Sequence, residues 1–167
     1  MNIVDLVIVF ASFLVGIVYS SAFEWTMHKE FMHKKRWIFR YAFESHDQGH
    51  HYQFVTGSTF FATKPEAYKL FQTSQMHWVF IGHILLLFGV WFWSSQYMAW
   101  SVMAWQISIP FMFAILLYMM AYEVIHHVIH HPVDRWPFNT RLFQLLVERH
   151  RGHHYFEVSG HQCSHGA

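Results

Sequence analysis

The sequence predicts an all-α fold: an integral membrane helical bundle of about three transmembrane helices, with a histidine-rich helical cap at the cytoplasmic face. The first observation is composition, because the 167 residues are 54% hydrophobic, 20% aromatic and only 13% charged. Soluble globular domains carry about twice that share of charged residues. The second observation is three long apolar runs, and the third is an unusual count of sixteen histidines. We expect residues 1–167 to form a single membrane-embedded domain.

The three apolar runs are each long enough to cross a bilayer as a helix. The first covers Ile3–Phe23, and it is expected to be a retained anchor because no basic residue precedes it, as one would in a cleaved signal peptide. The second covers Met76–Trp93. The third covers Met98–Tyr122, with a kink expected at Pro110. The short connection "SSQY" predicts that the second and third helices form an antiparallel hairpin.

Basic residues predict the orientation of these helices. All eleven Lys and Arg residues lie in two segments, residues 24–75 and 123–167. Three crossings place these segments on one side of the membrane, which the positive-inside rule identifies as cytoplasmic. Lys34, Lys35 and Arg36 could contact anionic lipids or dock an acidic protein. The aromatic residues expected at the two membrane interfaces are Trp25, Trp37 and Tyr41 on one side, and Trp93, Tyr97 and Trp100 on the other.

Twelve of the histidines belong to clusters in these same two segments. On an α-helix, residues three and four apart share a face, so His126 with His130, and His150 with His153 and His154, are expected to point in one direction. Residues five apart differ by about 140° around a straight α-helix. We therefore expect His28 and His33, and likewise His46 and His51, to point to different places. Two neighbouring metal ions, each taking ligands from several helices, would satisfy this pattern.

The remaining histidines are interpreted as lesser groups. A lone histidine in a membrane helix is usually an interfacial polar residue, which we expect of His77 and His83. His127 and His131 are expected to support metal ligands without binding metal themselves. The tail residues His161 and His165, with the single cysteine Cys163, are expected to form a solvated end of the chain. That one cysteine cannot form an intramolecular disulfide.

Four histidine motifs occur in order along the chain. They are HxxxxH at His28–His33, HxxxHH at His46–His51, HxxxH within "YEVIHHVIHH" at Tyr122–His131, and HxxHH at His150–His154. With a membrane hairpin between the second and third motifs, this order resembles the fatty acid hydroxylase and sterol desaturase superfamily of membrane non-haem di-iron enzymes. The resemblance covers Glu24–Tyr155.

The resemblance implies a centre of two iron ions, which zinc could replace in preparations. It implies an oxidoreductase of the lipid monooxygenase type, which uses O₂ and two external electrons to hydroxylate a C–H bond of a fatty acyl chain, sterol or similar lipid. Glu123 is the acid expected next to the metal ligands, ahead of Glu30, Asp47 and Glu148. The implied metal ligands are His28, His33, His46, His50, His51, His126, His130, His150, His153 and His154.

Partners follow from the same interpretation. A lipid substrate could enter from the bilayer between aromatic side chains, for which the candidates are Phe23, Phe31, Phe60 and Phe61. The chain has neither a Gly-rich dinucleotide loop nor a cysteine set, so a separate electron-transfer protein is expected. No nucleic acid is expected as a partner. The protein could form an oligomer. Family members commonly have four membrane helices, so residues Phe54–Phe71 could form a partial fourth helix.

Other functions remain open at this point. Within the same superfamily, a lipid desaturase, a carotenoid hydroxylase or an oxidative decarboxylase would use similar motifs. A membrane metal-binding protein without oxygenase activity is an alternative of a different class, although polar residues along the helices are sparse. A b-type cytochrome would need a haem ligand opposite His83, and the third apolar run offers none at matching depth.

Overall fold

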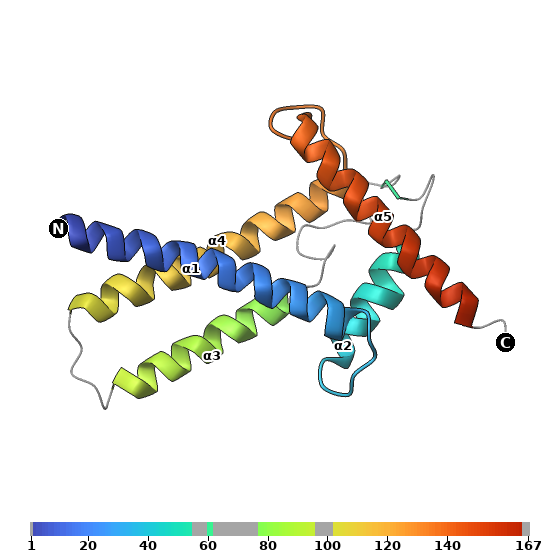
Figure 1. The fold of residues 1–167 in the computed structure, drawn as a ribbon. Helices are drawn as coiled ribbons and strands as arrows, with labels where there is room; N and C mark the ends of the chain where they lie inside the picture. The colour runs from blue at the N-terminus through green and yellow to red at the C-terminus, as the bar shows by residue number, and fades with distance from the viewer. Residues whose placement is uncertain (1, 55–59, 62–76, 96–101, 165–167) are drawn as a thin grey trace. The chain divides into compact units, whose positions relative to one another are not determined.

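A computed structural model of the chain describes residues 2–54, 60–61, 77–95 and 102–164. Every regular element within these ranges is a helix, which confirms the predicted all-α class for the described residues (Figure 1). Five elements are α-helices and two are π-helices. In chain order they are α1 (Ile3–Met27), η1 (His28–Met32), α2 (Arg40–Phe43), η2 (Glu44–His51), α3 (His77–Ser95), α4 (Val102–His130) and α5 (Arg141–Ser164).

The chain divides into two compact units. The first unit comprises Met1–His28 and Met76–Tyr122, and the second comprises Lys29–Gln75 and Glu123–Ala167. Each unit therefore combines two stretches that are distant in sequence. The first unit holds the predicted apolar runs and the second holds most of the predicted histidine clusters. The prediction of one domain over residues 1–167 stays a prediction.

Within the described ranges, two helices are long and apolar enough to cross a membrane, judged by length and composition. They cover Ile3–Met32, with a mean hydropathy of 2.4, and Trp105–His130, with a mean hydropathy of 1.8. Helix α3 forms where the second apolar run predicts a helix, but its role as a third span stays a prediction, as does the cytoplasmic location of the second unit. Helix α4 continues through Pro110 and ends at His130, well beyond the predicted end at Tyr122.

Two further predictions fall partly or wholly outside the described residues. The turn between the second and third apolar runs includes residues 96–101, and the partial fourth helix includes residues 55–59 and 62–71. What the structure does describe near the turn is an edge-to-face contact between Trp91 of α3 and Trp105 of α4, with ring centroids 5.0 Å apart. The end of α3 thus lies near the start of α4, as an antiparallel hairpin requires.

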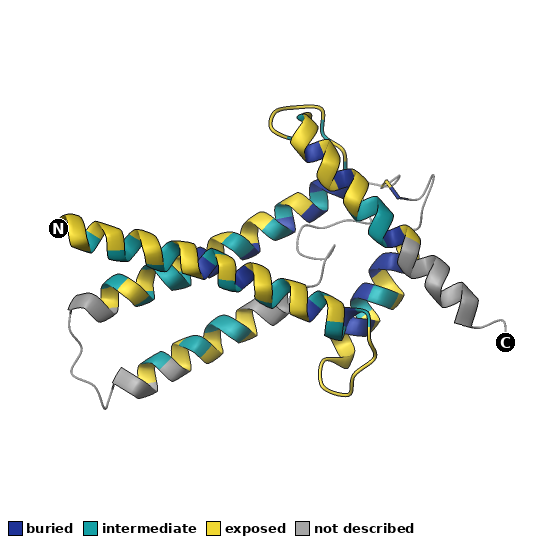
Figure 2. Cartoon of the chain, viewed as in Figure 1, coloured by how far each residue is buried: buried dark blue, intermediate teal, exposed yellow. Residues whose placement is uncertain are grey.

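Helices α1 and α4 approach closely at Gly16. A Cβ atom at this position would lie 2.7 Å from the Cβ of Ala114 and 2.8 Å from the carbonyl oxygen of Phe111. Gly16, Ser20 and Ala114 are buried, in contrast to most of α1 (Figure 2). The Ser20 hydroxyl donates a hydrogen bond of 2.8 Å to the Gly16 carbonyl. Small residues at a crossing let two membrane helices pack through their backbones.

This crossing predicts a large difference between two glycine-to-alanine substitutions. Gly16→Ala should lower the free energy of unfolding of the purified protein by about 1–3 kcal/mol, because backbone atoms must move to admit the methyl group. Gly89→Ala in α3 is the matched control, since nothing lies within 4 Å of a Cβ added there. Thermal unfolding in detergent micelles measures both. Equal melting temperatures for the two variants would contradict the close crossing.

The second unit has a small hydrophobic core that positions α5. The core joins the end of α4 to α5, and its buried members are Phe60, Val128, Ile129, Phe143 and Val147. Thr140 caps α5, because its hydroxyl oxygen accepts a hydrogen bond from the backbone N–H of Phe143 at 3.4 Å. Phe143, Val147, His150 and His154 follow one another at helical spacing on one face. Burial of the two apolar residues therefore turns the two histidines inward as well.

Candidate metal centre

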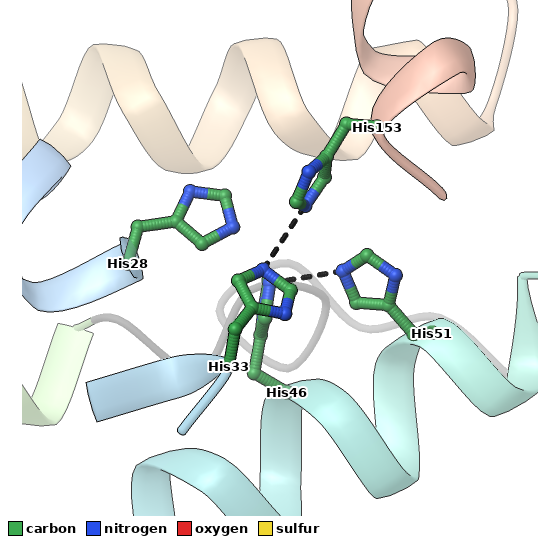
Figure 3. A group of neighbouring side chains, drawn as sticks. All are labelled: His28, His33, His46, His51 and His153. Carbon is green, nitrogen blue, oxygen red and sulfur yellow. Dashed lines mark hydrogen bonds between the residues drawn. The ribbon is translucent and has the colours of Figure 1, made fainter. Parts of the chain in front are cut away.

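The structure brings the ten predicted metal ligands together as two groups of five. Within each group, the atoms available for coordination all lie within 4.8 Å of one another. Figure 3 shows the first group, whose rings point toward a common centre. Four of its members belong to the second unit, and His28 is the residue at which the first unit ends. The first group is His28, His33, His46, His51 and His153, and the second group is His50, His126, His130, His150 and His154.

The π-helices overturn one expectation from the sequence. His46 and His51 do not point to different places: their Nε2 atoms lie 3.2 Å apart in the first group (Figure 3). The reason is that η2 is a π-helix, whose i→i+5 hydrogen bonds and wider turn bring residues five apart closer to one face than an α-helix does. The π-helix η1 has the same effect on His28 and His33, which also share the first group. Such segments are rare and occur often at functional sites.

Among the ten predicted ligands, histidines that are adjacent in sequence belong to different groups, whereas histidines five residues apart belong to the same group. His50 and His51 are neighbours in η2 but belong to different groups, and so do His153 and His154 in α5. Successive residues on an α-helix differ by about 100°. The expectation that His150, His153 and His154 all point one way is therefore wrong for His153, which faces the first group. Each of these two helices supplies both groups.

The spacing of the nitrogen atoms suits a metal ion. Two imidazole nitrogens bound to one ion at ~2.1 Å, at right angles, are ~3.0 Å apart. The shortest Nε2 to Nε2 distances in both groups match this value. They are 3.1 Å for His33 and His153, 3.2 Å for His46 and His51, 3.0 Å for His50 and His126, 3.1 Å for His130 and His150, and 3.0 Å for His150 and His154.

His33 and His130 are oriented through their other ring nitrogen. The Nδ1 atom of His33 lies 3.2 Å from a carboxylate oxygen of Asp47, and the Nδ1 atom of His130 lies 2.9 Å from the backbone carbonyl oxygen of Phe60. Both oxygens accept hydrogen bonds, so Nδ1 carries the proton and the neutral ring directs the Nε2 lone pair into its group. This arrangement is typical of histidines that bind metal ions.

Burial keeps several of these rings neutral. Removal from water lowers the pKa of His50 and His150 well below the usual value, and neighbouring imidazoles, His126 first among them, lower it further. Burial likewise lowers the pKa of His154 to about 2. A neutral imidazole presents a lone pair, whereas a protonated one repels a cation. At pH 7 these three side chains are therefore ready to bind a metal ion.

The lowered pKa values predict that acid unfolds the metal-free protein. A histidine in the unfolded chain has a pKa of ~6.5, so the unfolded state binds more protons than the native state once the pH falls below that value. The free energy of unfolding should be nearly constant above pH 7 and should fall as the pH drops through about 6. Thermal unfolding between pH 8 and pH 5 measures this. His154→Phe should make the free energy of unfolding fall less steeply as the pH drops. The same pH dependence in this variant and in the wild type would contradict a lowered pKa of His154.

The four candidate acids have different positions. Asp47 is bonded to His33, and Glu123 is fully buried in α4, one turn before His126. Glu30 instead pairs with Lys34 at 2.7 Å, and Glu148 is exposed to solvent. Asp47 and Glu123 are thus the acids suited to offset the charge of a bound cation. The expectation for Glu30 and Glu148 stays a prediction, and their positions favour it less, because Glu30 pairs with Lys34 and Glu148 faces solvent.

Aromatic side chains cover the second group. Phe60 is fully buried, with its ring centroid 4.9 Å from that of His130. Phe54, which the sequence interpretation overlooked, lies closer, at 4.1 Å from His130. Its position four residues after His50 was the available signal. Phe61 is 36% exposed, and Phe31 packs edge-to-face on Phe39. Phe23, the fourth aromatic candidate, lies in the first unit and stacks on His83.

The lesser histidines lie outside both groups wherever they are described. His127 and His131 stack on each other, with ring centroids 4.1 Å apart, and the Nδ1 atom of His131 donates to the His127 carbonyl. Their predicted support of the ligands stays a prediction. The side chains of His77, His161, Cys163 and His165 fall outside the described residues.

The chain thus defines a helical protein with two apolar helices long enough to span a membrane and two buried histidine groups that could bind metal ions. Comparisons with protein-family models, with characterised proteins and with solved structures find no match to the chain.

Proposed function

We propose that the protein is a membrane di-iron oxygenase, which uses O₂ and two external electrons to hydroxylate a C–H bond of a lipid. The observation that carries this proposal is the juxtaposition of the two histidine groups. His51 of the first group stacks on His154 of the second, with ring centroids 4.1 Å apart. Two five-histidine groups in such contact suit a pair of metal ions better than one ion.

The choice of iron rests on chemistry and on the four motifs. Imidazole binds iron, zinc and copper alike, so the donor set alone does not select the metal. Zinc has no accessible redox states, whereas an iron pair, when bound, would supply the electrons and open positions that O₂ activation requires. The order of the histidine motifs resembles the di-iron hydroxylases, which favours iron.

Residues around the histidines would hold the charge of the ions. Ten neutral imidazoles provide no negative charge, so a bound cation pair needs anionic neighbours. Asp47 can provide one through His33, and the buried carboxyl group of Glu123 can provide another. The rings of Phe54 and Phe60 exclude water from the second group, which protects reactive species from side reactions.

A lipid is the proposed substrate because the chain combines this site with membrane-spanning helices. Ile3–Met32 runs directly into the first histidine group, since His28 lies within it. We therefore propose that the substrate is the acyl chain of a lipid. The electrons would come from a separate protein on the cytoplasmic side, and the exposed residues Lys35 and Arg36 could contribute to its docking.

Metal analysis and product analysis test the proposal. Protein purified without chelators should contain iron, and Mössbauer spectra should show a coupled pair of iron ions. Cells that produce the protein under ¹⁸O₂ should accumulate a lipid carrying one ¹⁸O atom, and the His130→Ala variant should not form it. A desaturase would instead give a lipid lacking two hydrogens. Tightly bound zinc together with an unchanged lipid profile would refute the oxygenase and favour a metal-binding protein.

A further inference from the structure

The first unit contains a polar pair that the proposed oxygenase does not use. The hydroxyl oxygen of Tyr19 in α1 lies 2.6 Å from Nε2 of His83 in α3. Apolar rings surround the pair: Phe23 stacks on His83 with centroids 4.1 Å apart, and Phe111 lies 5.4 Å from Tyr19. Polar side chains within membrane helices are costly and mark functional sites more often than chance.

Tyr19 and His83 can each form a further hydrogen bond, whichever of them donates the proton in the bond between them. If Tyr19 donates to Nε2, the Nδ1–H of His83 remains as a donor and the tyrosine oxygen as an acceptor. If Nε2–H donates to the tyrosine, the phenol O–H remains as a donor and Nδ1 as an acceptor. Among the described residues, no other group hydrogen-bonds to the side chain of Tyr19 or of His83. One donor and one acceptor are therefore available to a ligand.

An apolar cavity begins about one helical turn from this pair, although neither Tyr19 nor His83 lines it. It has a volume of about 720 Å³, and its lining is apolar except for the hydroxyl of Ser108 and the indole N–H groups of Trp91 and Trp105. Val15, which lines it, is one turn before Tyr19 on α1, and Leu87, which also lines it, is one turn after His83 on α3. Phe111 contacts both the cavity and the Tyr19 ring. The volume is that of a site for one small molecule.

We infer that the first unit binds a long-chain lipid alcohol, with its hydrocarbon chain in the cavity and its hydroxyl on Tyr19 and His83. A hydroxyl offers one donor and one acceptor, which complements the pair. A carboxylate has no proton to donate and would bring an unpaired charge among apolar helices. An alkane would leave both polar groups unused. The site consists only of first-unit residues, so it does not depend on the metal centre.

Photolabelling of the full-length protein in phosphatidylcholine vesicles tests this site. The probe is a sixteen-carbon primary alcohol with a diazirine at mid-chain, and labelled residues are identified by mass spectrometry of peptides. Labels should concentrate on α3 and α4 residues that line the cavity, such as Phe88 and Met112. Excess 1-hexadecanol should displace the probe, whereas hexadecane should displace it several-fold less well.

Three variants separate the polar and apolar parts of the site. Tyr19→Phe should reduce displacement by 1-hexadecanol about fivefold and leave displacement by hexadecane unchanged, because only a hydrogen bond is lost. Ser108→Phe fills the cavity and leaves the polar pair intact, so it should reduce labelling of the cavity by the probe. Tyr52→Phe is the matched control, because Tyr52 is exposed in the second unit. Uniform labelling of exposed positions on α1, or equal displacement by alcohol and alkane, would overturn the inference.

Discussion

Replacement of His126 by alanine is expected to remove the metal ion that we propose for the second group, and His46→Ala is expected to remove the ion that we propose for the first. Each residue is buried and contributes an Nε2 atom within 3.2 Å of a neighbouring Nε2 atom in its own group. Loss of one nitrogen leaves four of the five imidazoles of the group, which is an incomplete set of ligands for the ion. Each single variant should contain about half the wild-type metal, and the double variant should contain almost none.

His127→Ala is the control for this experiment, because His127 is adjacent to His126 but lies outside both groups. Its metal content should equal that of the wild type. Metal content is measured by inductively coupled plasma mass spectrometry, and circular dichroism verifies that the helices remain. If His46→Ala and His126→Ala both retain the wild-type metal content while folded, the two histidine groups do not bind the ions.

The membership of the site could be predicted from the sequence, but the allocation of its residues between the two groups could not. The resemblance of the four motifs to a known superfamily implied ten histidine ligands, and the structure gathers all ten. The allocation depends on helix type. A period of 3.6 residues separates His46 from His51, whereas the wider turn of the π-helix η2 brings both into the first group. Single-sequence patterns assume the α-helical period and cannot detect this change.

In the fold, too, features set by local sequence could be predicted, whereas features set by contacts between distant residues could not. Apolar runs predict where α1 and α3 form because burial in lipid needs only local hydrophobicity. Helix α4 extends to His130 because Val128, Ile129 and His130 are buried by contacts with distant residues such as Phe60 and Phe143. His83 was interpreted as an isolated interfacial residue, since its partner Tyr19 lies 64 residues away in the sequence. Neither contact leaves a local signal.

Asp47→Ala is expected to weaken metal binding by about 10–100-fold without removing any metal ligand. The Asp47 carboxylate accepts a hydrogen bond from Nδ1 of His33 at 3.2 Å, and both side chains are nearly buried, with exposed fractions of 9% and 8%. The negative charge of Asp47 makes Nε2 of His33 a better lone-pair donor to a metal ion. The hydrogen bond also fixes the ring so that Nε2 faces Nε2 of His153, 3.1 Å away. Without Asp47, the ring can rotate and the charge of the cation is less well compensated.

Asp47→Asn separates these two effects, because the amide oxygen can still accept the hydrogen bond but carries no charge. Its affinity should lie between those of the wild type and Asp47→Ala if orientation and charge both contribute. Anaerobic titration of the metal-free protein with Fe²⁺ in competition with a chelator measures the affinities. Asp134→Ala, at an exposed acid of the second unit, is the matched control. Equal affinities for Asp47→Ala and Asp134→Ala would mean that the carboxylate near His33 plays no part in binding, and the orientation of that ring would then have to come from packing against His46 and His51, whose ring centroids lie 5.0 Å and 4.8 Å from it.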